Sequence, residues 1–237
     1  MTIFPHHENE IAQSEAANGA PFANYWMHNG HITVDNKKMS KSAGNFFLTR
    51  DVAAKYGYEV IRYLMIQAQY RAPMNYSVEL LDACKASLDR LYECRDTVKR
   101  AAENAKNGEI SAAAQEIFEK YRAQFIEALE DDLNTADALT AVFELVRELN
   151  IMASDANTSK EQLLAGSAVF EELISVLGLL YERKEEEIPQ EVLDLVEQRA
   201  AARKAKDFAE ADRLRDAITA LGYSVRETRQ GVEIKKV

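Results

Sequence analysis

Three lysines and two serines crowd the short segment KKMSKSAGNF at residues 37–46. Lysine ammonium groups bind phosphates as compact charges, because their donors rotate toward whichever oxygen carries the negative charge. Hydroxyl groups and the backbone around a flexible glycine add further donors to such an anion site. The segment therefore predicts a phosphate-binding loop, although a short match of this kind also fits a basic loop that is simply solvated.

A second group of reactive side chains lies in FPHHENE, at residues 4–10. His6 and Glu10 are four residues apart, so on a helix they project from one face and offer two ligands to zinc. His7 stands three residues before Glu10, near the same face. Acidic residues in a first helical turn are equally well explained by the helix dipole, and a closed zinc site needs four ligands. Taken alone, the pair predicts half of a metal site.

The cysteines do not complete that site. Cys84 and Cys94 lie ten residues apart in one helical pattern, so they face different sides of the helix. In that arrangement they form neither a disulfide nor a zinc-ligand pair. We expect two buried thiols in a reducing compartment.

Basic residues recur near the carboxyl end, where they alternate with acidic ones. Arginine side chains on one face bind RNA phosphates and stack on unpaired bases. The same alternation is typical of a solvated face with helix-stabilising ion pairs. The candidates for such a basic face are Arg199, Arg203, Lys204, Lys206, Arg213 and Arg215.

The first elements along the chain mix helix and strand. Residues 6–17 have a helical pattern that closes at Asn18 and Gly19. Residues 22–27 and 32–34 are aromatic or β-branched, and the Asn-Gly pair between them predicts a hairpin.

Beyond the lysine segment the pattern becomes helical. Thr49 is a good N-cap for a short helix, and the apolar spacing over 58–70 predicts another. Four longer amphipathic stretches with short connections then predict an antiparallel helical bundle. Their approximate ranges are 77–107, 111–130, 134–153 and 159–180.

The carboxyl end predicts a separate small unit of two helices and a hairpin, at 189–204, 207–220 and on either side of 229–231. The fold class is therefore mainly α with small α/β parts. We assign the apolar and aromatic residues at helical spacing to the bundle core rather than to a cofactor pocket. These residues are Tyr63, Tyr70, Leu80, Leu91 and the stripe over 142–149.

Charge and hydropathy narrow the classes of function. The net charge of −10 argues against indiscriminate nucleic-acid binding, which needs a basic field over the phosphates. Residues 189–237 differ from the rest, since ten lysines and arginines there balance nine acidic residues. No apolar run approaches the roughly 18 residues that cross a bilayer, and the start has no signal-peptide pattern. We expect a cytoplasmic protein.

Several of these segments together resemble one family, the cysteinyl-tRNA synthetases, which are class I aminoacyl-tRNA synthetases. The KMSKS loop between a strand and a helix, followed by a bundle, is the signature of that class. FPHHENEIAQSEA, WMHNGHITVDNKKMSKSAGNF, LMIQAQYRAPMNYS, DDLNTADAL and RAAARKAKDFAEADRLRDAI carry the closer resemblance, which covers nearly all of the 237 residues.

The resemblance implies roles for particular residues. Lys41 and Lys38 would be catalytic and would bind ATP, with Ser40 and Ser42 also at the ATP site and magnesium as the accompanying ion. His6 and Glu10 would hold one zinc ion together with two cysteines. Zinc would select cysteine by binding its thiolate, a soft ligand that a serine hydroxyl imitates poorly. The partners would be cysteine, ATP and cysteine tRNA, and the full enzyme would be a monomer.

The resemblance also implies a division of the chain. Residues 1–48 would be the carboxyl-terminal remnant of a Rossmann catalytic domain, 49–76 a segment that contacts the tRNA stem, 77–183 the bundle, 184–188 a linker and 189–237 an α+β anticodon-binding domain.

The chain departs from the family pattern because it lacks the two zinc cysteines and the HIGH motif. His28-Asn29-Gly30-His31 spells a similar HxGH, but the true motif opens a helix after a first strand, whereas this one stands shortly before the lysine segment. We therefore interpret His28 and His31 as turn or surface residues, and Trp26 remains without an assigned role.

Three functions follow as alternatives. The first is the carboxyl-terminal part of a cysteine–tRNA ligase, inactive in catalysis by itself but able to bind tRNA. The second is a stand-alone RNA-binding or regulatory module derived from such an enzyme. The third is a related ligase that joins cysteine to a sugar amine, which the anticodon-type carboxyl end disfavours.

Overall fold

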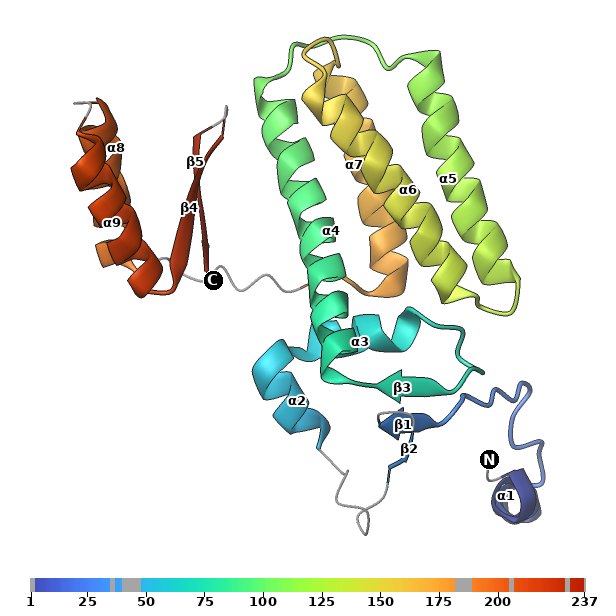
Figure 1. Ribbon diagram of the computed structural model, residues 1–237. Coiled ribbons are helices and arrows are strands. Elements are labelled where there is room, and N and C mark those ends of the chain that lie inside the picture. The colour runs from blue at the N-terminus through green and yellow to red at the C-terminus, as the bar shows by residue number, and fades with distance from the viewer. Residues whose placement is uncertain are drawn as a thin grey trace. The chain divides into compact units, whose positions relative to one another are not determined.

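The structure is a computed structural model that describes residues 3–34, 37–39, 48–181, 189–204, 207–228 and 231–236. It divides into two compact units, Met1–Glu182 and Arg183–Val237. Figure 1 shows helices predominating in both units, which confirms the mainly helical fold class. None of the described helices is long and apolar enough to cross a membrane.

The first unit begins with a short π-helical turn, Ile3–His7, followed by helix α1, Glu8–Asn18. The predicted helical pattern from His6 therefore begins two residues before α1, because His6 and His7 belong to the π-helical turn. Gly19 ends α1 in the left-handed conformation, at φ 65°. No residue of α1 is buried.

The predicted hairpin is wrong. Residues 22–27 form no strand, and β1, Ile32–Val34, pairs antiparallel with β2, Lys37–Lys38, and parallel with β3, Met74–Tyr76. The sheet order is β2-β1-β3. The Asn-Gly pair does not form a hairpin turn here. Strand β1 pairs instead with β3, far along the chain, where Thr33 aligns with Asn75.

Two short helices lie between the strands. Helix α2 is Thr49–Tyr56 and helix α3 is Tyr58–Ile66. Thr49 is the first helical residue rather than the N-cap, and Leu48 at the N-cap position has no side-chain cap. Helix α3 ends four residues earlier than predicted, so Gln67–Pro73 form a loop that leads into β3.

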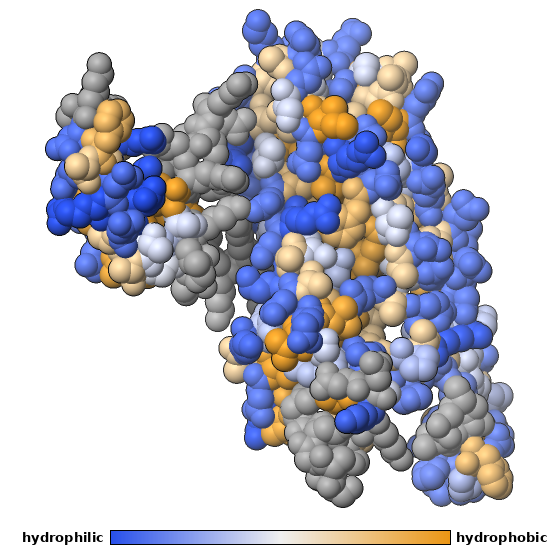
Figure 2. Space-filling model, in the orientation of Figure 1, coloured by the Kyte–Doolittle hydropathy of each residue, from blue (hydrophilic) through white to orange (hydrophobic). Residues whose placement is uncertain are grey.

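Four long helices follow: α4, Val78–Asn104; α5, Ala112–Glu130; α6, Thr135–Ser154; and α7, Lys160–Leu177. They run alternately in opposite directions (Figure 1). Each has a polar N-cap whose side chain accepts a backbone N–H, namely Ser77, Ser111, Asn134 and Ser159. Figure 2 shows hydrophilic residues over most of the visible face, with apolar residues between the helices.

The core of the first unit joins these helices. Leu91, Val142, Leu145 and Leu149 have no exposed surface, so the assignment of the 142–149 stripe to the core is confirmed. Tyr63 is also buried, and Leu80 packs partly buried against the same core. Tyr70 does not belong to it, because its hydroxyl points to a carboxylate at the exposed α5–α6 turn.

Glu59 of α3 is the buried acidic residue of the described chain, with 8% of its surface exposed. Its carboxylate accepts a hydrogen bond from the Tyr92 hydroxyl of α4 at 2.7 Å and another from the backbone N–H of Leu180, just after α7. Nearby, Arg62 Nε donates to the carbonyl of Leu177 at 2.7 Å. These contacts attach α3 to the bundle.

The second unit contains α8, Gln190–Lys204; α9, Phe208–Ala220; and the antiparallel strands β4, Tyr223–Thr228, and β5, Gly231–Lys236. This matches the predicted order of two helices and a hairpin. Val192, Ile218 and Tyr223 form its small core, and Ala211 and Leu214 of α9 are also buried.

We expect Glu59→Ala to lower the free energy of unfolding of the first unit by about 2–3 kcal/mol, since it leaves a buried hydroxyl and a buried N–H without an acceptor. Urea denaturation followed by circular dichroism measures the change. The exposed Glu116→Ala in α5 is the control, with an expected change within about 0.5 kcal/mol. Equal losses in the two variants would contradict the role of Glu59.

Candidate functional site

The lysine segment begins in β2. Val34 aligns with Lys37 and Thr33 with Lys38 across the antiparallel pair. Lys37 is exposed. The predicted phosphate ligands Ser40, Lys41 and Ser42 lie outside the described residues. The structure thus locates β2, the strand in which the lysine segment begins.

Contacts from β3 and the loop before it hold that strand in place through β1. The N–H of Gly30 donates to the carbonyl of Tyr70 at 2.7 Å, and the N–H of Met74 donates to the carbonyl of His31 at 3.0 Å. A Cβ atom at Gly30 would lie 2.1 Å from the carbonyl oxygen of Ala72, so the two backbones approach too closely for any side chain. This close approach explains why glycine is required there.

An aromatic cluster lies beside the start of α1. The ring of His7 stacks on the ring of His28 at 5.1 Å and an interplanar angle of 8°, and on Trp26 at 6.2 Å. Phe22 packs against Trp26 at 5.5 Å. His28 is therefore half-buried in a stack rather than a free turn residue. No sequence signal could indicate this, because the fold alone brings residues 7 and 28 together.

The candidate zinc ligands His6 and Glu10 are both exposed. In the part of the chain that the structure describes, no group of three or more His, Cys, Asp or Glu side chains could hold a metal ion. An imidazole and a carboxylate suit zinc chemically, but two donors do not make a closed site. The role of His6 and Glu10 as zinc ligands therefore stays a prediction.

The two cysteines lie in the bundle core, each 1% exposed. Burial raises the pKa of the Cys84 thiol to about 11 and that of Cys94 to about 12. Since the thiolate is the form that binds metals and reacts, both groups are inert at neutral pH. The expectation of two buried thiols without a disulfide is confirmed.

The candidate RNA-binding arginines of α9 have acidic partners on the same helix. Arg213 makes two hydrogen bonds to Glu210, at 2.6 and 2.8 Å, which raise the pKa of Arg213 and lower that of Glu210. Arg215 lies 3.4 Å from Asp212 and 3.7 Å from Asp216. These pairs follow the alternating-charge interpretation of the sequence.

The other candidates lie in or after α8. Arg199 is half-buried and Arg203 is exposed. Lys204 is the last residue of α8, and Lys206 lies outside the described residues. Sequence reasoning passed over Phe208, which stands directly after the N-cap Asp207 and is 62% exposed. An aromatic residue at the first position of a helix, next to a basic stretch, is the signal that could have found it.

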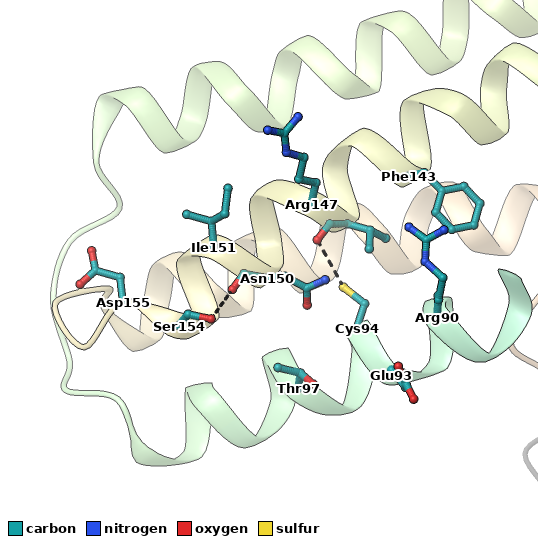
Figure 3. Close-up of a pocket in the computed structure, with 11 residues that line it drawn as sticks. Arg90, Glu93, Cys94, Thr97, Phe143, Arg147, Asn150, Ile151, Ser154 and Asp155 are labelled. Atoms are coloured by element: carbon teal, nitrogen blue, oxygen red, sulfur yellow. Dashed lines mark hydrogen bonds between the residues drawn. The ribbon is translucent and has the colours of Figure 1, made fainter. Parts of the chain in front are cut away.

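A groove of about 790 Å³ lies between α4 and α6 (Figure 3). The Arg90 guanidinium lies 4.9 Å from the centre of the Phe143 ring on one side of it. Cys94 Sγ donates to the carbonyl of Val146 at 4.0 Å below. None of the predicted site residues that the structure describes lines this groove.

Three family models match successive parts of the chain. Residues 2–86 match the catalytic domain of class I (C) tRNA synthetases, residues 124–181 match the DALR domain, and residues 185–234 match the anticodon-binding domain of cysteinyl-tRNA ligase.

Curated relatives match over almost the whole chain. A cysteine–tRNA ligase from Caldicellulosiruptor saccharolyticus is 49% identical over 99% of the chain and 51% of its own length. One from Lachnospira eligens is 45% identical over 97% of the chain and 49% of its own length. The chain thus spans about half the length of these relatives. A solved LeuRS–tRNA–LeuAMS ternary complex from Agrobacterium radiobacter covers 64% of the chain at 20% identity and a TM-score of 0.45.

We expect the free energy of unfolding to fall as the pH rises above the ordinary thiol pKa of 9.0. Below that value the thiols are protonated in both states, so their contribution to stability is fully present. Above it, the unfolded thiols ionise while the folded ones keep their protons up to about 11 and about 12, and the stability is progressively lost.

Urea denaturation between about pH 8 and about pH 10 measures this loss, which approaches about 1.4 kcal/mol per pH unit for each thiol. Other titrating groups also contribute, so the comparison is with a double variant, Cys84→Ala with Cys94→Ala, which should lose less stability over the same range. An identical pH slope in the two proteins would show that the thiols do not account for the effect.

Proposed function

This chain belongs to the cysteinyl-tRNA synthetase family, and we propose that it is the carboxyl-terminal portion of a cysteine–tRNA ligase. Such an enzyme joins the carboxylate of cysteine to the α-phosphate of ATP, which forms cysteinyl-AMP and releases pyrophosphate. It then transfers the cysteine to a hydroxyl group of tRNA and releases AMP. The observation that carries the proposal is that a catalytic, a DALR and an anticodon-binding model match in this order along one chain.

In this proposal the lysine segment serves the ATP phosphates. Lys41 and Lys38 place ammonium groups where negative charge grows on the phosphates as cysteine attacks, and Ser40 and Ser42 add hydroxyl donors. The pairing of β2 with β1 supports it, because that pairing ties the start of a polar lysine segment to a sheet. Magnesium would share the neutralisation of the phosphates.

His6 and Glu10 would supply two of the four zinc ligands, with two cysteines from outside these 237 residues. Bound zinc would supply a Lewis acid that prefers a thiolate to a hydroxyl, and so would favour cysteine over serine. The stack of His7 on His28 and Trp26 supports this role, because it restrains the backbone between the two ligands.

The boundaries proposed for the chain follow from the same assignment. Residues 1–48 belong to the catalytic domain, 49–76 contact the tRNA stem, 77–183 form the bundle and 184–188 link it to the anticodon-binding domain at 189–237. The linker lies outside the described residues.

The second unit would bind the anticodon loop of cysteine tRNA. Unpaired bases stack on exposed aromatic rings and on arginine planes, and phosphates attract basic side chains. Phe208 is 62% exposed and can accept a stacked base, and Arg203 also lies on the surface of this unit. Arg213 and Arg215 would contribute less, because acidic neighbours already occupy their donors.

We expect the 237-residue chain by itself to catalyse no exchange of pyrophosphate into ATP in the presence of cysteine. Its sequence contains neither the HIGH motif nor the two zinc cysteines of the family, so half of the adenylation site has no residues to form it. Radiolabelled pyrophosphate exchange measures the reaction, with Lys41→Ala as the background. Exchange that exceeds this background would overturn the prediction.

We expect the chain to bind cysteine tRNA more tightly than the same tRNA with a changed anticodon, and to keep this preference at higher salt. Phe208→Ala should weaken binding about tenfold, as loss of one base stack does. Leu193→Ala, at a partly exposed apolar site on α8, is the matched control and should leave binding unchanged.

Fluorescence anisotropy with labelled tRNA at two salt concentrations measures both effects. Binding that is weak, salt-sensitive and indifferent to the anticodon would contradict recognition of bases by the second unit. Equal losses in the Phe208 and Leu193 variants would contradict the stacking role of Phe208.

A further inference from the structure

The carboxylate of Asp132, in the turn between α5 and α6, collects polar contacts from the loop that leads into β3. Oδ1 accepts from the Tyr70 hydroxyl at 2.9 Å and from Arg71 Nη2 at 3.1 Å. Oδ2 lies 3.0 Å from Arg71 Nε and accepts from Gln69 Nε2 at 3.3 Å. Gln69 Nε2 also reaches the backbone carbonyl of Asp132 at 3.3 Å. Three successive loop residues therefore converge on one carboxylate.

The turn that presents Asp132 adopts a costly backbone conformation. Asp132 and Leu133 have φ of 55° and 54°, in the left-handed region that residues other than glycine rarely adopt. Backbone hydrogen bonds hold the turn closed, from Leu133 N to Leu129 O at 3.1 Å and from Asn134 N to Ala128 O at 3.1 Å. Asn134 then caps α6. These hydrogen bonds hold the turn that carries Asp132 in a defined position at the end of the bundle.

The loop is braced internally as well. The N–H of Arg71 donates to Gln69 Oε1 at 2.7 Å, and Arg71 Nε donates to the Tyr70 hydroxyl at 2.9 Å. The Arg71 guanidinium also lies 5.5 Å from the centre of the Tyr70 ring. Arg71 and Asp132 are 65% and 45% exposed, so a single ion pair here would contribute little, whereas several contacts to one carboxylate restrain the loop together.

The same loop holds the strand that precedes the lysine segment. The carbonyl of Tyr70 accepts from Gly30 N at 2.7 Å, next to the side chain that Asp132 binds. Gly30 leads directly into β1, and β1 carries β2 on one edge and β3 on the other. Figure 1 shows the α5–α6 turn at the same end of the bundle as β3 and its loop.

We propose that Asp132 is a positioning residue for the lysine segment: it anchors the Gln69–Arg71 loop to the bundle and so fixes β1 and, through β1, the strand β2. Asp132 lies in the turn between α5 and α6, far along the chain from the lysines. Its importance for phosphate binding rests on the proposed function, whereas the anchoring of β1 does not.

The test replaces Asp132 with Asn in the ¹⁵N-labelled 237-residue chain. Asparagine tolerates the left-handed backbone as aspartate does, so the change removes the charge and leaves the turn intact. Asp131→Asn is the matched control, since in the described part of the chain Asp131 makes no side-chain contact with the loop. Amide hydrogen exchange is measured by NMR at Gly30 and Met74, whose N–H groups make the two bonds across the loop and β1.

We expect exchange at Gly30 and Met74 to be about fivefold faster in Asp132→Asn and to change less than about twofold in Asp131→Asn. The amide of Leu145, in the bundle core, should exchange at the same rate in all three proteins. Unchanged exchange at Gly30 and Met74 would overturn the proposal. Faster exchange at Leu145 by the same factor would also overturn it, because Asp132 would then stabilise the bundle as a whole.

A titration with ATP, followed at the amides of Val34 and Lys37, tests the link to phosphate binding. We expect Asp132→Asn to need about threefold more ATP than the wild type for the same shift, and Asp131→Asn to match the wild type. If Asp132→Asn and the wild type bind ATP equally well despite faster amide exchange in the variant, the contacts of Asp132 do not affect β2. If the wild type itself does not respond to ATP, the proposed phosphate role of the segment fails for this chain, and the exchange rates alone decide the anchoring.

Discussion

The parallel pairing of β1 with β3 is the interaction on which the amino-terminal half of the first unit depends. Three residues on each strand make it, from Ile32 with Met74 to Val34 with Tyr76. Parallel strands need a long crossover, and here the crossover contains the lysine segment and helices α2 and α3. The backbone can close this pairing only because Gly30 has no side chain to strike Ala72. The lysine segment is thus part of the crossover connection between the paired strands β1 and β3.

A rigid bundle supports this small sheet from two sides. Glu59 attaches α3 to the chain just after α7, Arg62 attaches it to the last residue of α7, and Asp132 holds the loop before β3. The first attachment is buried and the second is exposed, so they differ in kind. The hydrogen bonds of a buried carboxylate contribute to stability together, because removal of one partner leaves the other buried groups without a hydrogen bond. An exposed cluster restrains geometry at a smaller free-energy cost.

The second unit rests on a much smaller core, built around Val192, Ile218 and Tyr223. In a unit of this size, most of the helix surface is exposed to solvent and carries charged residues. Helix α9 accordingly alternates arginine with acidic residues that pair along the helix. Phe208, the first residue of α9, is 62% exposed. Exposed aromatic rings on a charged helix are a feature of RNA-binding surfaces, in keeping with the family match over 185–234.

The sequence by itself determined the family, the mainly helical class, the approximate starts of the long helices and the core stripe over 142–149. These depend on local signals, either a residue type at a helix start, such as Ser77, or an apolar period, such as that over 142–149.

Tertiary structure decided the contacts between residues far apart in sequence. Strand β1 pairs with β3, which lies beyond two helices, and not with the residues before the Asn-Gly pair. Tyr70 was predicted in the core, but its hydroxyl binds Asp132 instead. The stacking of His7 on His28 likewise needed both segments to be folded. The physical reason is that helical periodicity is set by neighbours three and four residues away, whereas strand pairing and side-chain networks depend on which distant groups the chain brings within reach.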